Sequence, residues 1–98
     1  MIRRRRILQG VEPAHIPVVG EQVLARRSAV NPWTLAEVVR VRPAARGRIR
    51  VDFRWLADNP DCLTPVASGT RGNVFLDPDG WPPLIARLPE VPEAAQEN

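Results

Sequence analysis

The sequence predicts an all-β domain: a small five-stranded barrel with a short C-terminal helical turn. Short runs rich in branched apolar and aromatic residues recur along the 98-residue chain, and Gly, Pro, Asn and Asp gather between them. Almost no stretch shows the apolar period of an amphipathic helix. The length suits one domain. Two packed sheets would also fit these patterns, but a small barrel is favoured at this size.

Composition divides the chain into three parts. Residues 1–19 form a basic arm and an extended segment, in which Pro13 and Pro17 exclude a stable helix. Residues 20–88 form the predicted barrel, and residues 89–98 form an acidic tail that we expect to be disordered. All 14 basic residues are Arg, and the net charge is +3. The body is more basic than this value suggests, because Glu90, Glu93 and Glu97 lie in the tail.

The first predicted strand covers residues 20–27. Alternation places Val23 and Ala25 on one face and Leu24 and Arg26 on the other. A polar loop follows, and its Asn-Pro pair at residues 31–32 indicates a turn.

The second and third strands are predicted as a hairpin over residues 33–42 and 48–55. Residues 43–47 connect them and include Gly47, as hairpin loops of this length often do. One face of the third strand holds Ile49, Val51, Phe53 and Trp55. The other face holds Arg48, Arg50, Asp52 and Arg54.

The remaining strands are shorter. Residues 62–66 predict a weak strand that Pro65 confines to an edge or an end, and residues 73–76 predict the last strand. Residues 77–80 have the composition of a type I turn. Residues 81–88 predict one helical turn that covers an open end of the barrel. Phe53, Phe75 and Trp81 are expected in the core, because a small barrel needs large core residues.

Enzymatic activity is not predicted. His15 is the only His and Cys62 the only Cys, and neither has a visible orienting partner, so no catalytic residue, metal site or cofactor is expected. A lone Cys excludes an internal disulfide and fits a reducing cytoplasm. No apolar run has transmembrane length. The Arg-rich start is followed by residues 10–15, which are no hydrophobic export segment, so we expect no export signal and no membrane partner.

The hairpin resembles the Tudor and wider SH3-like barrel family over roughly residues 20–59. The matching pieces are Gly20-x-x-Val23-x-Ala25, Trp33-Thr34-Leu35-Ala36-Glu37-Val38 and Ile49-x-Val51-x-Phe53-x-Trp55. The chain departs from the pattern where Thr34 replaces the usual aromatic and in the corner at residues 56–59. The resemblance implies a binding module rather than an enzyme. It also implies an aromatic ligand site with at most three rings, those of Trp33, Phe53 and Trp55.

The arginines predict contact with nucleic acid, either DNA or RNA. Like charges opposed across a hairpin cost up to about 1 kcal/mol per pair, and phosphate would offset that cost. The candidate phosphate-binding residues are Arg3, Arg4, Arg5, Arg6, Arg40, Arg42, Arg48, Arg50 and Arg54. Trp33 and Trp55 would stack on unpaired bases.

Three other interpretations of this surface remain open. In the first, the chain is a protein-interaction or assembly module within a larger complex. In the second, it is a small regulator that blocks a larger enzyme. In the third, the arginines form an ordinary solvated face, because a chain without any Lys points to a GC-rich genome.

Overall fold

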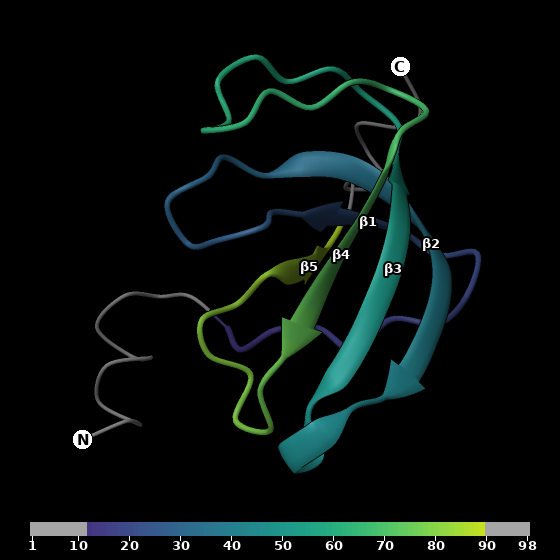
Figure 1. Cartoon of the computed structure of the whole chain (residues 1–98), viewed down its shortest axis with the longest axis vertical. Coiled ribbons are helices and arrows are strands. Elements are labelled where there is room, and N and C mark those ends of the chain that lie inside the picture. The colour runs from purple at the N-terminus through teal and green to yellow at the C-terminus, as the bar shows by residue number, and fades with distance from the viewer. Residues whose placement is uncertain (1–11, 90–98) are drawn as a thin grey trace, which may run out of the picture.

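The computed structural model describes residues 12–89, which form one five-stranded antiparallel sheet in the order β4-β3-β2-β1-β5 (Figure 1). The strands are β1 (Gln22–Ala25), β2 (Thr34–Pro43), β3 (Ile49–Trp55), β4 (Arg71–Leu76) and β5 (Ile85–Arg87), with a 3₁₀ turn η1 (Ala45–Gly47) between β2 and β3. The all-β prediction is confirmed. Backbone pairing leaves β4 and β5 at opposite edges, so the sheet of residues 12–89 is not closed. No helix in this range is long and apolar enough to cross a bilayer.

The predicted hairpin is present as β2 and β3, the two longest strands. Their register pairs Val41 with Val51 and Arg42 with Arg50. In the connecting turn, Arg46 and Gly47 both adopt positive φ, 64° and 73°. Gly47 takes that conformation without steric cost, which explains a glycine at the end of the connector.

A β-bulge between Val38 and Arg40 decides which face the hairpin arginines occupy. Before the bulge, Ala36 and Val38 point into the core. Strict alternation would carry Arg40 and Arg42 to that same face, but the extra residue shifts the phase by one. Both arginines therefore lie on the outer face of the sheet. The bulged strand is also visibly curved in Figure 1.

The core lies on the inner face of the sheet, where alternate residues of every strand meet. It contains Val23, Ala25, Ala36, Val38, Val51, Phe53, Trp55, Cys62, Val66, Val74, Leu76 and Ile85. Phe53 and Trp55 form an edge-to-face pair with ring centroids 4.7 Å apart. The prediction that Phe75 belongs to this core is wrong. Its neighbours Val74 and Leu76 point inward, so Phe75 points outward and is 43% exposed.

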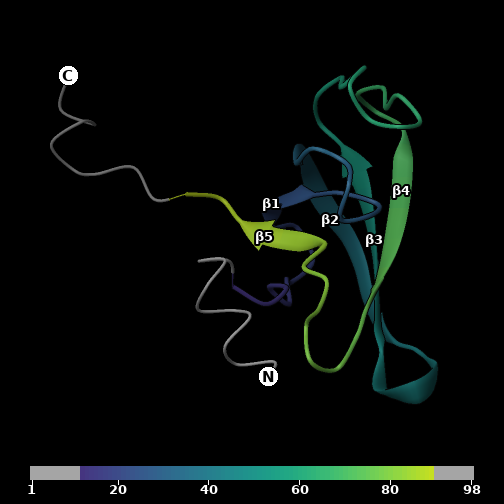
Figure 2. The same ribbon diagram turned by 90° about the vertical axis from the view of Figure 1, so that its left-hand side faces the viewer.

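The predicted C-terminal helical turn is replaced by strand β5. Its register pairs Val23 with Arg87 and Ala25 with Ile85. The open edge of β1 provides backbone partners for this segment, and a β conformation buries Ile85 completely. Figure 2 shows β1 and β5 side by side, to the left of β3 and β4.

The weak strand predicted at residues 62–66 is also wrong. This stretch forms bends, and its only strand-type pairing within residues 12–89 is the isolated Asn59–Val66 bridge. Side chains hold the loop instead. The Asn31 side-chain oxygen accepts a hydrogen bond from the Leu63 amide at 2.8 Å, and the Asn59 side-chain amide donates to Thr34 Oγ1 at 2.8 Å. A segment that is held by hydrogen bonds to side chains needs no neighbouring strand for its backbone.

The extended segment before β1 lies along β5. The Ala14 amide donates to the Gly80 carbonyl, and the His15 amide donates to the Ile85 carbonyl, each at 2.9 Å. Residues 12–19, which belong to the extended segment predicted after the basic arm, are therefore hydrogen-bonded to the rest of the fold. The Arg3 to Arg6 arm and the acidic tail from residue 90 onward lie outside the described residues.

Candidate functional site

The outer face of β2, β3 and β4 carries a three-by-three array of side chains. The cross-strand register aligns three rows: Phe75–Arg50–Arg42, Asn73–Asp52–Arg40 and Arg71–Arg54–Glu37. We call these nine residues the outer face. Five are arginines and two are carboxylates, so this face carries a net charge of +3.

Each carboxylate of the outer face is already bound to one arginine. Asp52 Oδ1 accepts from Arg50 Nε at 3.0 Å, and Glu37 Oε1 accepts from Arg54 at 2.9 Å. Arg40, Arg42 and Arg71 make no ion pair with any residue between 12 and 89. These three guanidiniums are the ones most available to an incoming anion.

Two pairs of arginines oppose each other directly across neighbouring strands. Arg42 is paired with Arg50, and Arg54 is paired with Arg71. Directly opposed like charges destabilise a sheet by a few tenths to about 1 kcal/mol per pair. Asp52 offsets part of this repulsion at Arg50, Glu37 offsets part of it at Arg54, and a bound anion would offset more of it.

Four of the predicted phosphate-binding residues come together on the outer face, namely Arg40, Arg42, Arg50 and Arg54. Arg48 precedes β3 and pairs with Asp77 at 3.1 Å, so its charge is matched. Arg71 was missed by sequence reasoning, although its position two residues before Asn73 on an alternating strand gives the signal.

The predicted aromatic ligand site does not form from its three rings. Phe53 and Trp55 are 0% and 1% exposed and pack on each other, so neither can offer a ring face to a ligand. Trp33 lies apart from this pair, under the guanidinium of Arg26, whose Cζ is 4.0 Å from the ring centroid. The Arg26 side chain also donates to the Pro83 carbonyl at 3.0 Å. The exposed aromatic ring of the outer face is that of Phe75.

A small pocket of about 190 Å³ opens at the end of the sheet beside Trp55. Its apolar wall includes Cys62 and Val66, and Arg27 stands in its lining. Val30 and Leu63, on the two loops at this end, are 75% and 78% exposed. This end therefore combines exposed apolar side chains with a pocket, and we call it the loop end.

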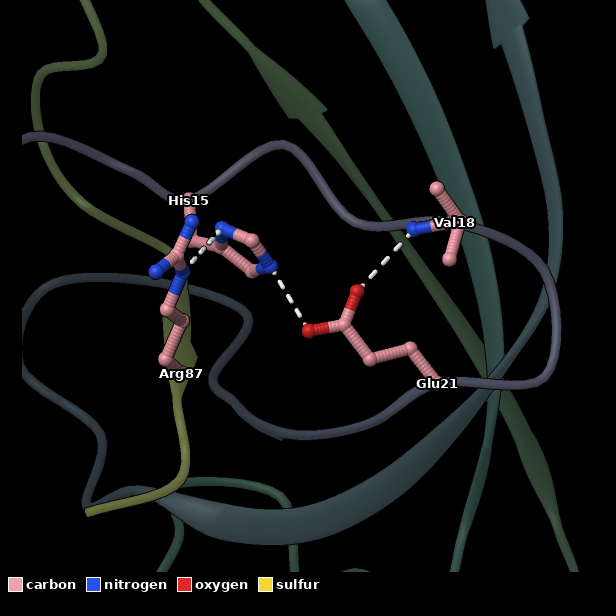
Figure 3. Close-up of polar contacts among 4 residues, drawn as sticks. All are labelled: His15, Val18, Glu21 and Arg87. Carbon is pink, nitrogen blue, oxygen red and sulfur yellow. Dashed lines mark hydrogen bonds and ion pairs between the residues drawn. The ribbon is translucent and has the colours of Figure 1, made fainter. Parts of the chain in front are cut away.

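The only His takes part in a polar cluster that holds the N-terminal segment to the sheet (Figure 3). Arg87 Nε can only donate, so His15 Nδ1 accepts its hydrogen bond at 3.1 Å. His15 Nε2 therefore carries the proton and donates to Glu21 at 2.7 Å. Burial raises the pKa of Glu21, but hydrogen bonds from the Val18 amide and His15 and the charge of Arg87 outweigh it, so this pKa is lowered.

The only Cys makes a separate contact. Cys62 is buried, and its sulfur lies 4.0 Å from Thr34 Oγ1. His15 and Cys62 thus have different partners, and neither contacts the outer face. The arrangement on the outer face can bind an anion through guanidinium groups and offer one ring to a flat ligand.

Comparisons with protein-family models, with curated proteins and with solved structures found no match to this chain.

Proposed function

We propose that this protein is a non-enzymatic module that binds nucleic acid through the outer face of β2, β3 and β4. The carrying observation is the set of opposed arginine pairs, Arg42–Arg50 and Arg54–Arg71, on a face with only two carboxylates. Phosphate satisfies several guanidiniums at once and releases counterions on binding. The free thiol of Cys62 supports the cytoplasmic location expected from the sequence.

The proposal includes an SH3-like barrel, closest to the Tudor type. The strand order supports it, because β1 to β4 form a meander and β5 returns to the free edge of β1. In this arrangement β2 lies between two parts of the sheet, β3 with β4 on one side and β1 with β5 on the other. The bulge in β2 supplies the bend that a strand shared by both parts needs. The Tudor type's methyl-ligand cage is not part of the proposal, because Phe53 and Trp55 are buried.

The test is a salt titration of binding to labelled single-stranded and double-stranded DNA and RNA. Contacts from the three unmatched arginines give a slope of log K against log salt of about −2 for a single strand, so a fourfold rise in salt weakens binding about 20-fold. Arg40→Ala makes the slope shallower by about 0.7, and the Arg40→Ala/Arg42→Ala double variant by about 1.4.

Arg27→Ala is the matched control, because Arg27 is an exposed arginine at the loop end, away from the outer face. It should leave the slope unchanged. The absence of binding to any nucleic acid at low salt, or an equal effect of the Arg27 and Arg40 variants, contradicts the proposal.

A second candidate function is protein interaction through the loop end. The supporting observation is the exposure of Val30 and Leu63 beside the pocket at Trp55, since exposed apolar groups around a concavity are typical of docking sites. In that case the partner would be a protein of a larger complex, with an apolar side chain in the pocket and an acidic group near Arg27.

A further inference from the structure

Phe75 is the one large apolar side chain on the outer face. The other eight residues of that face are charged or polar. The alternation of β4 sends Val74 and Leu76 into the core and leaves Phe75 43% exposed. Single exposed apolar residues are common on protein surfaces and need no explanation by themselves. The neighbours of Phe75 are what distinguish it.

The cross-strand register places Phe75, Arg50 and Arg42 in one row. Neighbouring strands lie about 4.8 Å apart, so the backbones of β4 and β2 are roughly 10 Å apart along this row. A flat ring therefore stands at one end of a line of two positive charges. The row thus offers a ring for a base and neighbouring guanidiniums for its phosphate.

Arg50 is held in place over the ring. Its Nε donates to Asp52 at 3.0 Å, and its Cζ lies 5.8 Å from the centroid of the Phe75 ring. The carboxylate fixes the guanidinium without neutralising the row, because Arg42 opposite has no ion pair within residues 12–89. The ring and the charges are thus arranged before any ligand arrives, which lowers the entropy cost of binding.

We propose that Phe75 stacks on an unpaired base, so that the outer face binds single-stranded nucleic acid in preference to duplex. The reason is chemical. Base faces in a duplex are stacked on each other and closed to a protein ring, whereas an unpaired base offers its π-face to any aromatic side chain. This inference rests on the proposed function, because it names the form of nucleic acid that the outer face takes. It applies equally to DNA and RNA.

The test compares Phe75→Ala with the wild-type full-length chain by fluorescence anisotropy, using a labelled single strand and the duplex of the same length. Removing one base–aromatic stack should weaken single-strand binding roughly 5- to 140-fold. The salt slope should stay unchanged, because no charge is removed. Duplex affinity should change less than about twofold. Phe75→Trp should keep or strengthen single-strand binding, because Trp also stacks.

Val30→Ala is the control, since Val30 is an exposed apolar residue at the loop end, away from the outer face. It should change neither affinity appreciably, and thermal melting checks that each variant is folded. The stacking inference is overturned if Phe75→Ala weakens single-strand and duplex binding equally, or if it weakens neither. In that case, salt-dependent binding by the wild-type chain would still support the proposed function. If the wild-type chain binds neither ligand at low salt, the proposed function and this inference both fail.

Discussion

Gly72 is the residue whose substitution tests the packing beneath the outer face most sharply. It stands on β4 opposite Phe53, and a methyl group there would lie 2.8 Å from Phe53 Cε1 and 3.2 Å from Trp55 Nε1. Carbon atoms prefer about 3.5–4.0 Å, so one ring would have to move by about 0.7 Å. Both rings are fully buried in a packed core, which resists that movement.

We therefore expect Gly72→Ala to destabilise the protein. Overpacking costs about 1–3 kcal/mol, and the smaller unfolded-state entropy of Ala returns about 0.4–1 kcal/mol, which leaves a net loss of about 1–2 kcal/mol. In a domain of this size, each kcal/mol lowers Tm by roughly 4–8 °C. Urea unfolding followed by circular dichroism measures the free energy of unfolding directly.

The control for this experiment is Asn73→Ala, the neighbouring position on the opposite face, which should change stability by less than about 0.5 kcal/mol. A double-mutant cycle with Phe53→Leu identifies the partner, because Leu lacks the ring atoms that meet the new methyl group. The double variant should be at least about 0.5 kcal/mol more stable than the sum of the single effects. A Gly72→Ala protein as stable as the wild type would refute the packing described for β3 and β4.

Two further predictions concern the contacts that Glu21 makes with the N-terminal segment and that Arg26 makes with the segment before β5. Because the pKa of Glu21 is lowered in the folded state, its carboxylate stabilises the protein above its ordinary pKa of 4.5 and this stability is lost as pH falls below that value. Glu21→Gln should therefore show a smaller drop in urea midpoint between pH 7 and acid than the wild type, and an equal drop would count against the His15–Glu21 contact. Arg26→Ala removes the hydrogen bond to the Pro83 carbonyl and the contact with Trp33, so we expect a loss of about 1–3 kcal/mol by chemical unfolding. Arg26→Lys should recover only part of it, and full recovery would show that charge alone matters.

The inner faces of the hairpin were predictable because their signal is local. In β3, apolar and charged residues alternate without a break, so Val51, Phe53 and Trp55 were placed on one face from the sequence alone, and that face is the buried one. The same holds for Val23 and Ala25 in β1. Period-two alternation needs no knowledge of partners, which explains why these assignments are confirmed.

The bulge and β5 depend on partners far away in the chain. Strict alternation along β2 points Arg40 inward, and only the Val38-Val39 doublet before it hints at a change of phase. Residues 85–87 become a strand because β1, some sixty residues earlier, offers them an edge. Such non-local pairing leaves no local signature, and a short apolar run of this kind is ambiguous between helix and strand.

The candidate site was half predictable. The arginines of β2 and β3 were identified from the sequence. Arg71 was added to the outer face only by the register between β3 and β4. The predicted aromatic ligand site was wrong. The resemblance to the Tudor family assigned Phe53 and Trp55 to a ligand, whereas in this small core both rings are used for packing. The exposed ring is Phe75, whose own neighbours Val74 and Leu76 indicate its outward orientation.

The central claim is that the outer face of β2, β3 and β4 is where nucleic acid binds, and amide chemical shifts in an oligonucleotide titration test it most directly. We predict that the largest shifts fall on Arg40, Arg42, Asn73 and Phe75, with little change at Val30 and Leu63 on the loop end. Shifts that are confined to the loop end, or that appear nowhere on these three strands, would contradict the claim.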